Sequence, residues 1–236
     1  MRIDFSGERL LTVIAHPDDA EILCAGTLAR ALEDGARIGV CLLCRGDKGQ
    51  PDPPIEHLGE VRRDEMAAAA QLLGAQVFET GYGDGELFDS PESRRRLIDL
   101  YRQFRPTLIL AHSPQDYHPD HRAASALAEA ASWFCASAGH VTERPPMPSP
   151  PELWWMDHVN MSDFEPHFFV DVSPYVELKQ KMLGCHRSQL QRGDRSDFSP
   201  LEPLMLQQCT TRGTQSGVTA AEAFQTHHAW KRTRAW

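Results

Sequence analysis

The segment LLTVIA at residues 10–15, followed at once by HPDDAE at residues 16–21, decides the fold that the sequence predicts. The first six residues form a mostly apolar run that is rich in strand-forming side chains, which is typical of a parallel strand buried on both faces of a sheet. Beyond the polar turn, apolar residues recur at helical spacing over residues 22–34, and Gly35 is expected to end this helix. The segment therefore predicts a strand, a turn and a helix, which is the start of a β–α–β unit.

The same alternation continues through the first half of the chain. Further strands are predicted over residues 37–44, 76–80 and 107–111, and further helices over residues 60–73, 90–104 and 121–138. Strands that alternate with helices favour a parallel sheet with right-handed crossovers and helices on both faces. The expected fold class is therefore α/β, a Rossmann-like, doubly wound and mostly parallel sheet with the strand order 3-2-1-4-5.

The second half of the chain shows a weaker pattern. Residues 139–152 hold five prolines and are expected to form a loop. Strands are predicted over residues 153–159 and 168–172, a helix over residues 173–187, and a short helix at residues 219–224. Most of residues 188–220 are polar and without clear periodicity. We expect a single domain over residues 1–236, with a loop-rich C-terminal elaboration from about residue 188.

Composition excludes several classes of protein. Of the 236 residues, 41% are hydrophobic and 24% are charged, values that are typical of a globular chain. The formal net charge of -9 disfavours a nucleic-acid-binding protein, which normally carries a basic surplus. No stretch approaches the roughly 20 apolar residues that cross a bilayer, and the first residues lack the apolar core of a signal peptide. We expect a cytoplasmic protein with no membrane or nucleic-acid partner.

The six cysteines are irregularly spaced, which indicates free, mostly buried thiols rather than a disulfide framework. Cys41 and Cys44 form a C-x-x-C pattern inside the apolar run of residues 38–44. Positions three apart on a strand point to opposite faces of the sheet, so we expect that these two thiols neither bind a metal together nor form a redox pair. Both are interpreted as core residues.

Four of the eleven histidines fall in two clusters that also contain aspartates. Residues 16–21 read HPDDAE and follow the first strand, and residues 112–121 read HSPQDYHPDH and follow the fourth. In the predicted strand order these two strands are neighbours, and ligands bind in the crevice at their carboxyl ends. We therefore expect the two clusters to face each other. His112 is open to two interpretations, a plain polar strand end or a support for the site.

The residue types in the two clusters are those of a catalytic zinc site, since neutral imidazoles and a carboxylate are typical zinc ligands. His16 and Asp19 are three positions apart in a tight turn, and His118 and His121 are three apart where a loop enters a helix, so each pair can face one side. Taken alone, either cluster could instead be a turn in which an aspartate accepts a hydrogen bond from a nearby backbone N–H. We favour a metal site because both clusters are expected at the same edge of the sheet.

Asp18 and Asp19 are adjacent carboxylates. Two close negative charges are unfavourable unless a cation or a proton offsets one of them. A divalent metal ion offsets the charge and allows one carboxylate to bind the metal while the other accepts a proton. The pair therefore adds a candidate general base to the predicted site.

These motifs together resemble the LmbE-like, or PIG-L-like, family of zinc-dependent N-acetylglucosaminyl deacetylases. The specific part is HPDD at residues 16–19 and HPDH at residues 118–121, combined with the α/β alternation. Further segments look like motifs of the same family: residues 24–29 (CAGTLA), 62–65 (RRDE), 83–87 (GDGEL), 170–173 (VDVS), 186–189 (HRSQ) and 221–224 (AEAF). The resemblance covers about residues 10–225.

The resemblance implies a zinc centre with one Zn²⁺ per chain. His16, Asp19 and His121 look like the zinc ligands, and Asp18 looks like the general base that activates a zinc-bound water. Glu21 is displaced by one position relative to members that read HPDDE, and we interpret it as a structural residue near the site.

The resemblance also implies roles for residues around the centre. His118 looks like the residue that, when protonated, stabilises the developing oxyanion or protonates the leaving amine, and Asp120 looks like its orienting partner. Arg62 matches a family arginine near the site, and Tyr117 lies next to the site at a position where family members differ; both are expected to bind substrate. Arg62 could hold sugar hydroxyls or a substrate carboxylate, or it could instead form an ion pair with Glu65 on the surface of a helix.

The implied function is that of a zinc-dependent hydrolase that removes an N-acetyl group from an N-acetylglucosamine-type sugar conjugate, in a chain expected to form a homo-oligomer. The alternatives are a metal-dependent amidohydrolase acting on a non-sugar amide, a catalytically silent family member, and a nucleotide-binding Rossmann protein. The last of these predicts a glycine-rich turn after the first strand, where this chain has HPDD. The sequence leaves the identity of the sugar conjugate open.

Overall fold

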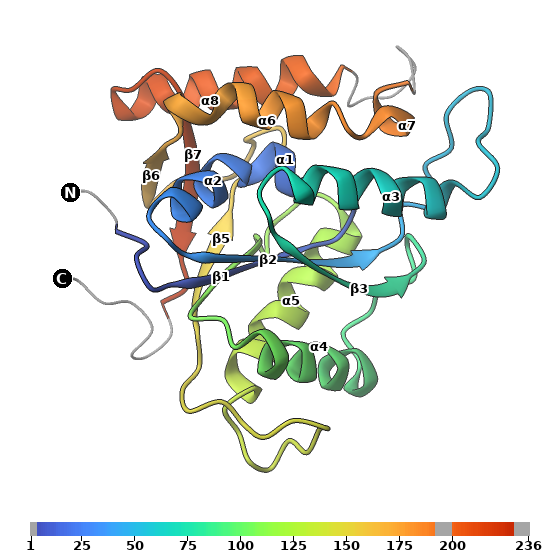
Figure 1. Cartoon of the computed structure of the whole chain (residues 1–236), viewed down its shortest axis with the longest axis vertical. Coiled ribbons are helices and arrows are strands. Elements are labelled where there is room, and N and C mark those ends of the chain that lie inside the picture. The colour runs from blue at the N-terminus through green and yellow to red at the C-terminus, as the bar shows by residue number, and fades with distance from the viewer. Residues whose placement is uncertain (1–3, 192–199, 229–236) are drawn as a thin grey trace.

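The computed structural model describes residues 4–191 and 200–228, which fold around a seven-stranded sheet. The strands are β1 (Arg9–Ile14), β2 (Arg37–Cys44), β3 (Gln76–Tyr82), β4 (Leu108–His112), β5 (Glu152–Met156), β6 (Phe168–Asp171) and β7 (Ala221–Thr226). Their order across the sheet is β3-β2-β1-β4-β5-β7-β6 (Figure 1). The helices are α1 (Asp19–Leu23), α2 (Ala25–Glu33), α3 (Leu58–Gln71), α4 (Pro91–Phe104), α5 (Pro119–Phe134), α6 (Val176–Leu183), α7 (Arg187–Leu190) and α8 (Leu201–Ser216), with a short 3-10 helix η1 (Ser173–Tyr175). Within the described ranges, none of the helices has both the length and the apolar character needed to span a membrane.

The first five strands confirm the predicted topology. β1 pairs in parallel with β2 and β4, β2 pairs with β3, and β4 pairs with β5. At the centre of the sheet, Thr12 of β1 pairs with Val40 of β2 on one side and with Leu110 of β4 on the other. The carboxyl ends of β1 and β4 therefore lie side by side, which is the edge where an α/β sheet of this order binds ligands.

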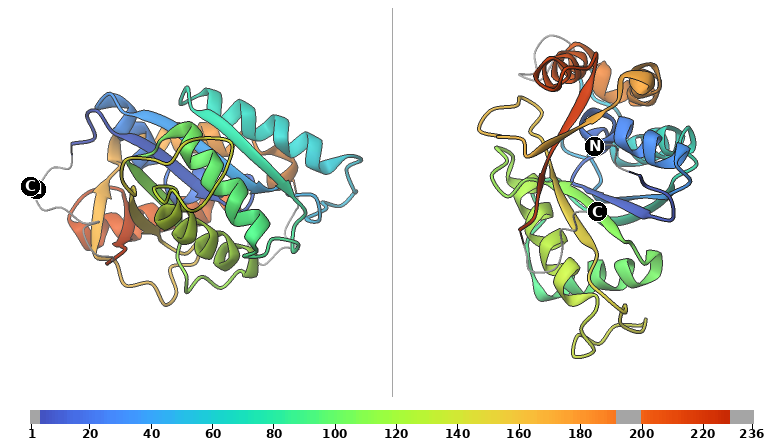
Figure 2. Two further views of the ribbon diagram at one scale, coloured as in Figure 1. Left: turned by 90° about the horizontal axis from the view of Figure 1, so that it is seen from below. Right: turned by 90° about the vertical axis from the view of Figure 1, so that its left-hand side faces the viewer.

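Helices cover both faces of the sheet, and alternate residues of β1 enter two separate apolar clusters. Leu10 and Ile14 pack in the cluster formed with α1, α2, α3, α6 and α8, whereas Leu11 and Val13 pack in the cluster formed with α4 and α5. In Figure 2 (left), α4 and α5 lie in front of the sheet. All four side chains are fully buried, and burial of each stabilises the fold by roughly 1.5–3 kcal/mol. The prediction of a strand buried on both faces is confirmed.

The C-terminal part of the fold differs from the prediction. The short helix predicted at residues 219–224 is wrong, because the chain forms β7 there, antiparallel to both β5 and β6. The alanine-rich segment AEAF has little strand preference of its own, so its pairing between two strands decides its conformation. Residues 201–216 form α8, which packs on β7, although Gly213 and three threonines lower the intrinsic helix propensity of this segment.

A buried carboxylate, that of Glu222, ties β7 to both α2 and α6. The first predicted helix is interrupted at Cys24, so α2 begins with backbone N–H groups that have no partner inside the helix. Glu222 of β7 accepts hydrogen bonds from two of these groups, Gly26 N at 2.9 Å and Thr27 N at 2.7 Å. Lys179 of α6 forms an ion pair with the same carboxylate and is fully buried. The last strand thus caps a helix near the start of the chain.

All six cysteines are free and five of them are buried, as the sequence predicts. Cys44 nevertheless differs from the prediction, because its side chain joins the same apolar cluster as Cys41 rather than the opposite one. The pairing register between β2 and β3 shifts between Leu42 and Cys44. Such an irregularity interrupts the alternation of side chains between the two faces of a strand. The thiol of Cys44 therefore lies on the face of the sheet that α4 and α5 cover, where regular alternation would not place it.

Candidate metal and catalytic site

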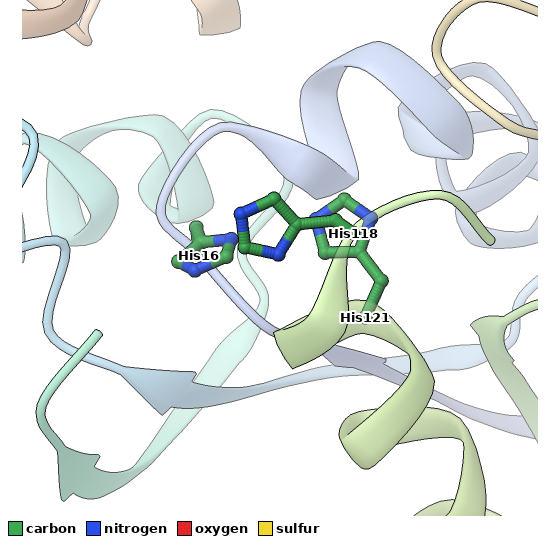
Figure 3. A group of neighbouring side chains, drawn as sticks. All are labelled: His16, His118 and His121. Atoms are coloured by element: carbon green, nitrogen blue, oxygen red, sulfur yellow. The ribbon is translucent and has the colours of Figure 1, made fainter. Parts of the chain in front are cut away.

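The two histidine clusters meet in a cavity of about 730 Å³ at the carboxyl ends of β1 and β4. His16 comes from the loop after β1, and His118 and His121 come from the start of α5 (Figure 3). The ring centroid of His118 lies 4.8 Å from those of both His16 and His121, and the centroids of His16 and His121 are 5.4 Å apart. The predicted convergence of the two clusters is therefore confirmed.

The turn after β1 is held in an unusual shape by its own side chains. Asp18 has a φ of 97°, a left-handed value that is uncommon for residues other than glycine. The backbone N–H of His16 donates to Asp19 Oδ2 at 2.7 Å, which is the bond expected of a simple turn. Asp19 also lies 3.4 Å from His121 Nε2 and 3.2 Å from His112 Nε2. The turn therefore brings Asp19 to the histidines and leaves Asp18 beside it as a buried neighbour with a strained backbone.

The second cluster is ordered by the N-terminus of α5. His118 is the N-cap residue, and its Nδ1 accepts a hydrogen bond from the backbone N–H of Asp120 at 3.1 Å. Pro119 occupies the first helical position, where its fixed φ and missing N–H are tolerated. His121 follows in the first turn and lines the same cavity as His118. Because Nδ1 of His118 accepts a hydrogen bond, the neutral ring carries its hydrogen on Nε2.

Two of the histidines each lie against a buried carboxylate. His16 Nε2 lies 3.0 Å from Asp120 Oδ2, and His121 Nδ1 lies 3.1 Å from Asp116 Oδ1. Asp120 therefore orients His16, which corrects the prediction that its carboxylate orients His118. At the start of α5 the backbone N–H of Asp120 donates to His118, the N-cap residue. The side chain of Asp120 points elsewhere and reaches His16 in the loop after β1.

The remaining nitrogens of these two histidines face Asp19. His16 Nδ1 lies 3.8 Å from Asp19 Oδ2, and His121 Nε2 lies 3.4 Å from Asp19 Oδ1. Ligand atoms about 2.0–2.2 Å from one tetrahedral zinc ion lie roughly 3.4 Å from one another. A metal-ligating histidine generally donates its other N–H to a carboxylate, as Asp120 and Asp116 allow here. His16 and His121 thus each present a ring nitrogen to Asp19, and the three residues offer the donor types of a divalent metal site.

Two further histidines offer ligand atoms nearby. The ligand atoms of His16, His118 and His121 lie within 4.8 Å of one another, and so do those of Asp19, His112 and His121. His112 is fully buried, which favours the interpretation that it supports the site. An ion in this cavity thus has more nitrogen donors close by than the three predicted ligands provide.

Burial and the charges in the cavity give the two adjacent carboxylates, Asp18 and Asp19, different pKa values. Burial and the charge of Asp19 raise the pKa of Asp18 to about 7, against the opposing influence of His186 and Arg62. Burial also acts on Asp19, but the charge of His121 beside it holds its pKa well below the usual value. Asp19 is thus an anion near neutral pH, whereas Asp18 can both gain and lose a proton there.

His118 and His121 differ in charge. Burial and the nearby charges of His121 and His16 lower the pKa of His118 to about 4. Burial would also lower the pKa of His121, but Asp19 and Asp116 outweigh it and raise that pKa to about 10. The surroundings thus favour a neutral ring for His118 and a charged ring for His121, whereas the resemblance implies a protonated His118.

Residues 11–132 match the family described as GlcNAc-PI de-N-acetylase, PIG-L, and this segment is just over half of the chain. The chain belongs to the PIG-L family. The matched segment contains most of β1, the whole of β2, β3 and β4, and both histidine motifs.

Relatives of this PIG-L family member include enzymes of two kinds. The chain is 27% identical to diacetylchitobiose deacetylase of Thermococcus kodakarensis, over 77% of its own length and 70% of that protein. It is 29% identical to 4-oxalmesaconate hydratase of Pseudomonas putida, over 76% of its own length and 73% of that protein. The solved structure of N,N'-diacetylchitobiose deacetylase from Pyrococcus horikoshii matches with a TM-score of 0.82 and 26% identity, covering 93% of this chain and 84% of that one. The likeness therefore extends well beyond the matched family segment.

Arg62 of this PIG-L family member anchors two segments of the cavity wall. Its guanidinium donates to the carbonyl oxygens of Gly46 and Gly49, each at 2.8 Å, and to the side chain of Gln189. The side chain is only 4% exposed. Arg62 thus ties the loop after β2 to α7, and its direct contact with a substrate stays a prediction.

Two acidic residues near Arg62, Glu65 and Glu21, contact Ser188 and His186. Glu65 accepts hydrogen bonds from the backbone N–H and the hydroxyl of Ser188, so the alternative of a surface ion pair between Glu65 and the buried Arg62 is wrong. Glu21 is fully buried, and its Oε2 lies 3.4 Å from His186 Nε2. This placement agrees with the interpretation of Glu21 as a structural residue.

Tyr117 lies at the mouth of the cavity, where it is 37% exposed. Its ring centroid is 6.3 Å from that of His118 and 5.9 Å from that of His121. Contact between Tyr117 and substrate stays a prediction.

Sequence reasoning missed two residues that support the site. Asp116 was not singled out, although it lies inside the second cluster and contacts His121. His186 belongs to one of the weaker motifs, and its proximity to Asp18 and Glu21 depends on how α7 packs. Both residues lie in motifs that the sequence shows, but their contacts with His121 and Glu21 become visible only in the folded structure.

Proposed function

We propose that this PIG-L family member is a metal-dependent N-deacetylase that hydrolyses the acetamide of an N-acetylglucosamine-type sugar conjugate. The observation that carries the proposal is the position of Asp18, a buried carboxylate next to the metal-ligand set of His16, Asp19 and His121 in one cavity. An amide carbon is a poor electrophile, so its hydrolysis needs an activated water, a polarised carbonyl and a base. The relatives named for diacetylchitobiose act on an N-acetyl sugar, which supports the same substrate class here.

The residues that would hold the metal are His16, Asp19 and His121, and we propose one Zn²⁺ per chain. Bound zinc supplies Lewis-acid chemistry, which acidifies a water molecule and polarises the acetyl carbonyl. Asp120 and Asp116 hold the two imidazoles by their far nitrogens, so that the near nitrogens stay available as ligands.

Asp18 acts as the general base in this proposal. Its carboxylate accepts a proton from the water molecule as the water oxygen bonds to the acetyl carbon. Asp18 then returns this proton to the nitrogen as the C–N bond breaks, which gives acetate and the free amine. The short turn that Asp18 shares with His16 and Asp19 fixes its position relative to the ligands.

His118 stabilises the negative charge that develops on the carbonyl oxygen. Its Nδ1 is held by the N–H of Asp120, so Nε2 carries the hydrogen of the neutral ring. A neutral Nε2–H that lines the cavity can donate a hydrogen bond to the oxyanion without first gaining a proton. This role replaces the protonated His118 that the resemblance implied.

A hydratase activity is the second candidate, because the hydratase of Pseudomonas putida is as similar to this chain as the deacetylases are. The charge of the cavity disfavours it. The carboxylates that line the cavity are those of Asp18, Asp19, Asp84, Asp120 and Glu202. The described residues that line it include one lysine and one arginine, Lys48 and Arg62, and Arg62 already donates to backbone carbonyls. A neutral acetamide suits this lining better than the anionic substrate that the name oxalmesaconate indicates.

The substrate class can be tested directly with a panel of compounds. The zinc-reconstituted chain is incubated with N-acetylglucosamine, N,N'-diacetylchitobiose, a non-sugar N-acetyl amide and 4-oxalmesaconate, and acetate, free amine and hydration product are measured. We expect equal amounts of acetate and free amine from at least one N-acetyl sugar. Hydration of 4-oxalmesaconate without acetate release would establish the hydratase instead. Acetate from the non-sugar amide alone would favour an amidohydrolase, and no turnover at full zinc occupancy would favour a silent member.

A further inference from the structure

A thiol lies directly beside the first histidine motif. Cys44 is the last residue of β2, and its backbone N–H donates to the carbonyl oxygen of Ala15 at 2.8 Å. Ala15 immediately precedes His16, so this pairing places the end of β2 next to the motif. The side chain of Cys44 is free and only 1% exposed.

The sulfur of Cys44 forms a compact group with His16 and Asp120. One ligand atom of each of the three residues lies within 4.8 Å of the other two. Within this group, His16 Nε2 is 3.0 Å from Asp120 Oδ2. The group therefore combines a thiol, an imidazole and a carboxylate, which are three of the side chains that bind metals in proteins.

We infer that Cys44, His16 and Asp120 form a second metal-binding set that takes a thiophilic divalent ion such as Cd²⁺. Thiolate ligands select soft ions, and imidazole binds both soft and borderline ions. The set of His16, Asp19 and His121 contains no sulfur, so the two sets differ in the ions that they prefer. When the ion binds, the thiol releases its proton to solvent and the ring hydrogen of His16 moves from Nε2 to Nδ1, so His16 serves one of the two sets at a time.

The second set shares His16 with the first but uses the opposite side of the ring. His16 Nε2 faces Asp120, whereas Nδ1 faces Asp19 at 3.8 Å. An ion at Cys44 therefore displaces the hydrogen bond that orients His16. The inference does not depend on deacetylase activity, because it concerns only which atoms bind the ion.

Cys41 provides a matched control on the same strand. It is fully buried in the same apolar cluster as Cys44 and lies three positions earlier on β2. In the described part of the chain, one group of candidate ligands contains a cysteine, and that cysteine is Cys44 and not Cys41. Substitution of either residue by serine removes one buried thiol from β2.

The test is a titration of the full chain, as purified, with Cd²⁺, followed by the ultraviolet absorption that arises when a thiolate binds cadmium. We expect the wild-type chain and Cys41→Ser to reach the absorption of one bound thiolate per chain, and Cys44→Ser to lose it. Absence of the absorption from the wild-type chain, or its survival in Cys44→Ser, would overturn the inference.

X-ray absorption at the cadmium edge is a second measurement that does not require Cys44→Ser to fold. In the wild-type chain we expect one sulfur neighbour together with nitrogen and oxygen neighbours. The same spectrum is expected from Cys185→Ser, which removes the half-buried cysteine. A cadmium site with only nitrogen and oxygen neighbours, or one that loses its sulfur in Cys185→Ser, would contradict the second set.

Discussion

His16 Nε2 and Asp120 Oδ2 lie 3.0 Å apart, although 104 positions separate the two residues in the chain. The contact joins the loop after β1 to the first turn of α5 and determines which nitrogen of His16 remains for a metal. The backbone N–H of Gly85 donates to the same Asp120 oxygen at 2.9 Å, so the loop after β3 contributes to the contact. Three loops at one edge of the sheet thus hold a single imidazole in place.

We expect Asp120→Asn to weaken zinc binding about 10–100-fold, because an amide favours the required tautomer of His16 less than a carboxylate does. Competition with a chromophoric chelator measures the affinity. Asp64→Asn, at a side chain that is 77% exposed, is the control and should bind zinc as the wild-type chain does. Unchanged zinc affinity with lower turnover in Asp120→Asn would show that Asp120 acts through His118 instead.

The ion pair between Lys179 and Glu222 leads to a prediction about stability. Glu222→Gln leaves the fully buried Lys179 without its counter-charge, so we expect the free energy of unfolding to fall by about 3 kcal/mol. Urea denaturation measures the change. Glu143→Gln, at a side chain that is 90% exposed, should leave the stability unchanged. The double variant Lys179→Met/Glu222→Gln should recover part of the loss. Equal stability of Glu222→Gln and the wild-type chain would contradict a stabilising role for the contacts of Glu222 with Lys179 and α2.

Gly26 probes the packing of α2 against the segment that follows β6. A Cβ atom at this position would lie 2.6 Å from the Cβ of Val172, which is closer than packed atoms allow. We expect Gly26→Ala to lower the free energy of unfolding by about 1–3 kcal/mol. At Gly139, a Cβ would meet only Ser137 Oγ at 3.8 Å, so Gly139→Ala should be tolerated. Thermal unfolding that does not distinguish the two variants would contradict this packing.

Arg62 can be assigned to the cavity wall or to the substrate by a conservative substitution. Arg62→Lys keeps the charge but loses the planar fork that reaches Gly46, Gly49 and Gln189. We expect a loss of about 2 kcal/mol in the free energy of unfolding, since buried carbonyl oxygens are left without donors. Chemical denaturation and steady-state kinetics are measured together. Wild-type stability combined with a raised KM would assign Arg62 to direct substrate binding.

Much of the fold and the position of the site could be predicted because the relevant signals are local. The run at residues 10–15 is apolar at every position except Thr12, and the structure buries it on both faces of the sheet. The order of the first five strands follows from the alternation of strands and helices, and that order alone brings the two histidine clusters together.

The remaining features depend on contacts between distant segments. Residues 221–226 form a strand because β5 and β6 pair with them on either side, which AEAFQT does not encode locally. The partner of Asp120 is His16 and not its sequence neighbour His118, because the N-cap uses only the backbone of Asp120. The thiol of Cys44 reaches His16 through a register shift, and spacing within one strand does not reveal such a shift.

Asp18 tests the account most directly, because its carboxylate is the group proposed to move the proton. The measurement compares acetate release from an N-acetyl sugar substrate and zinc content in the wild-type chain and in Asp18→Asn. We expect the variant to keep its zinc and to lose turnover by on the order of 10²–10⁴-fold, because an amide cannot accept the proton of the attacking water. An Asp18→Asn variant that retains full deacetylase activity with zinc bound would contradict the account.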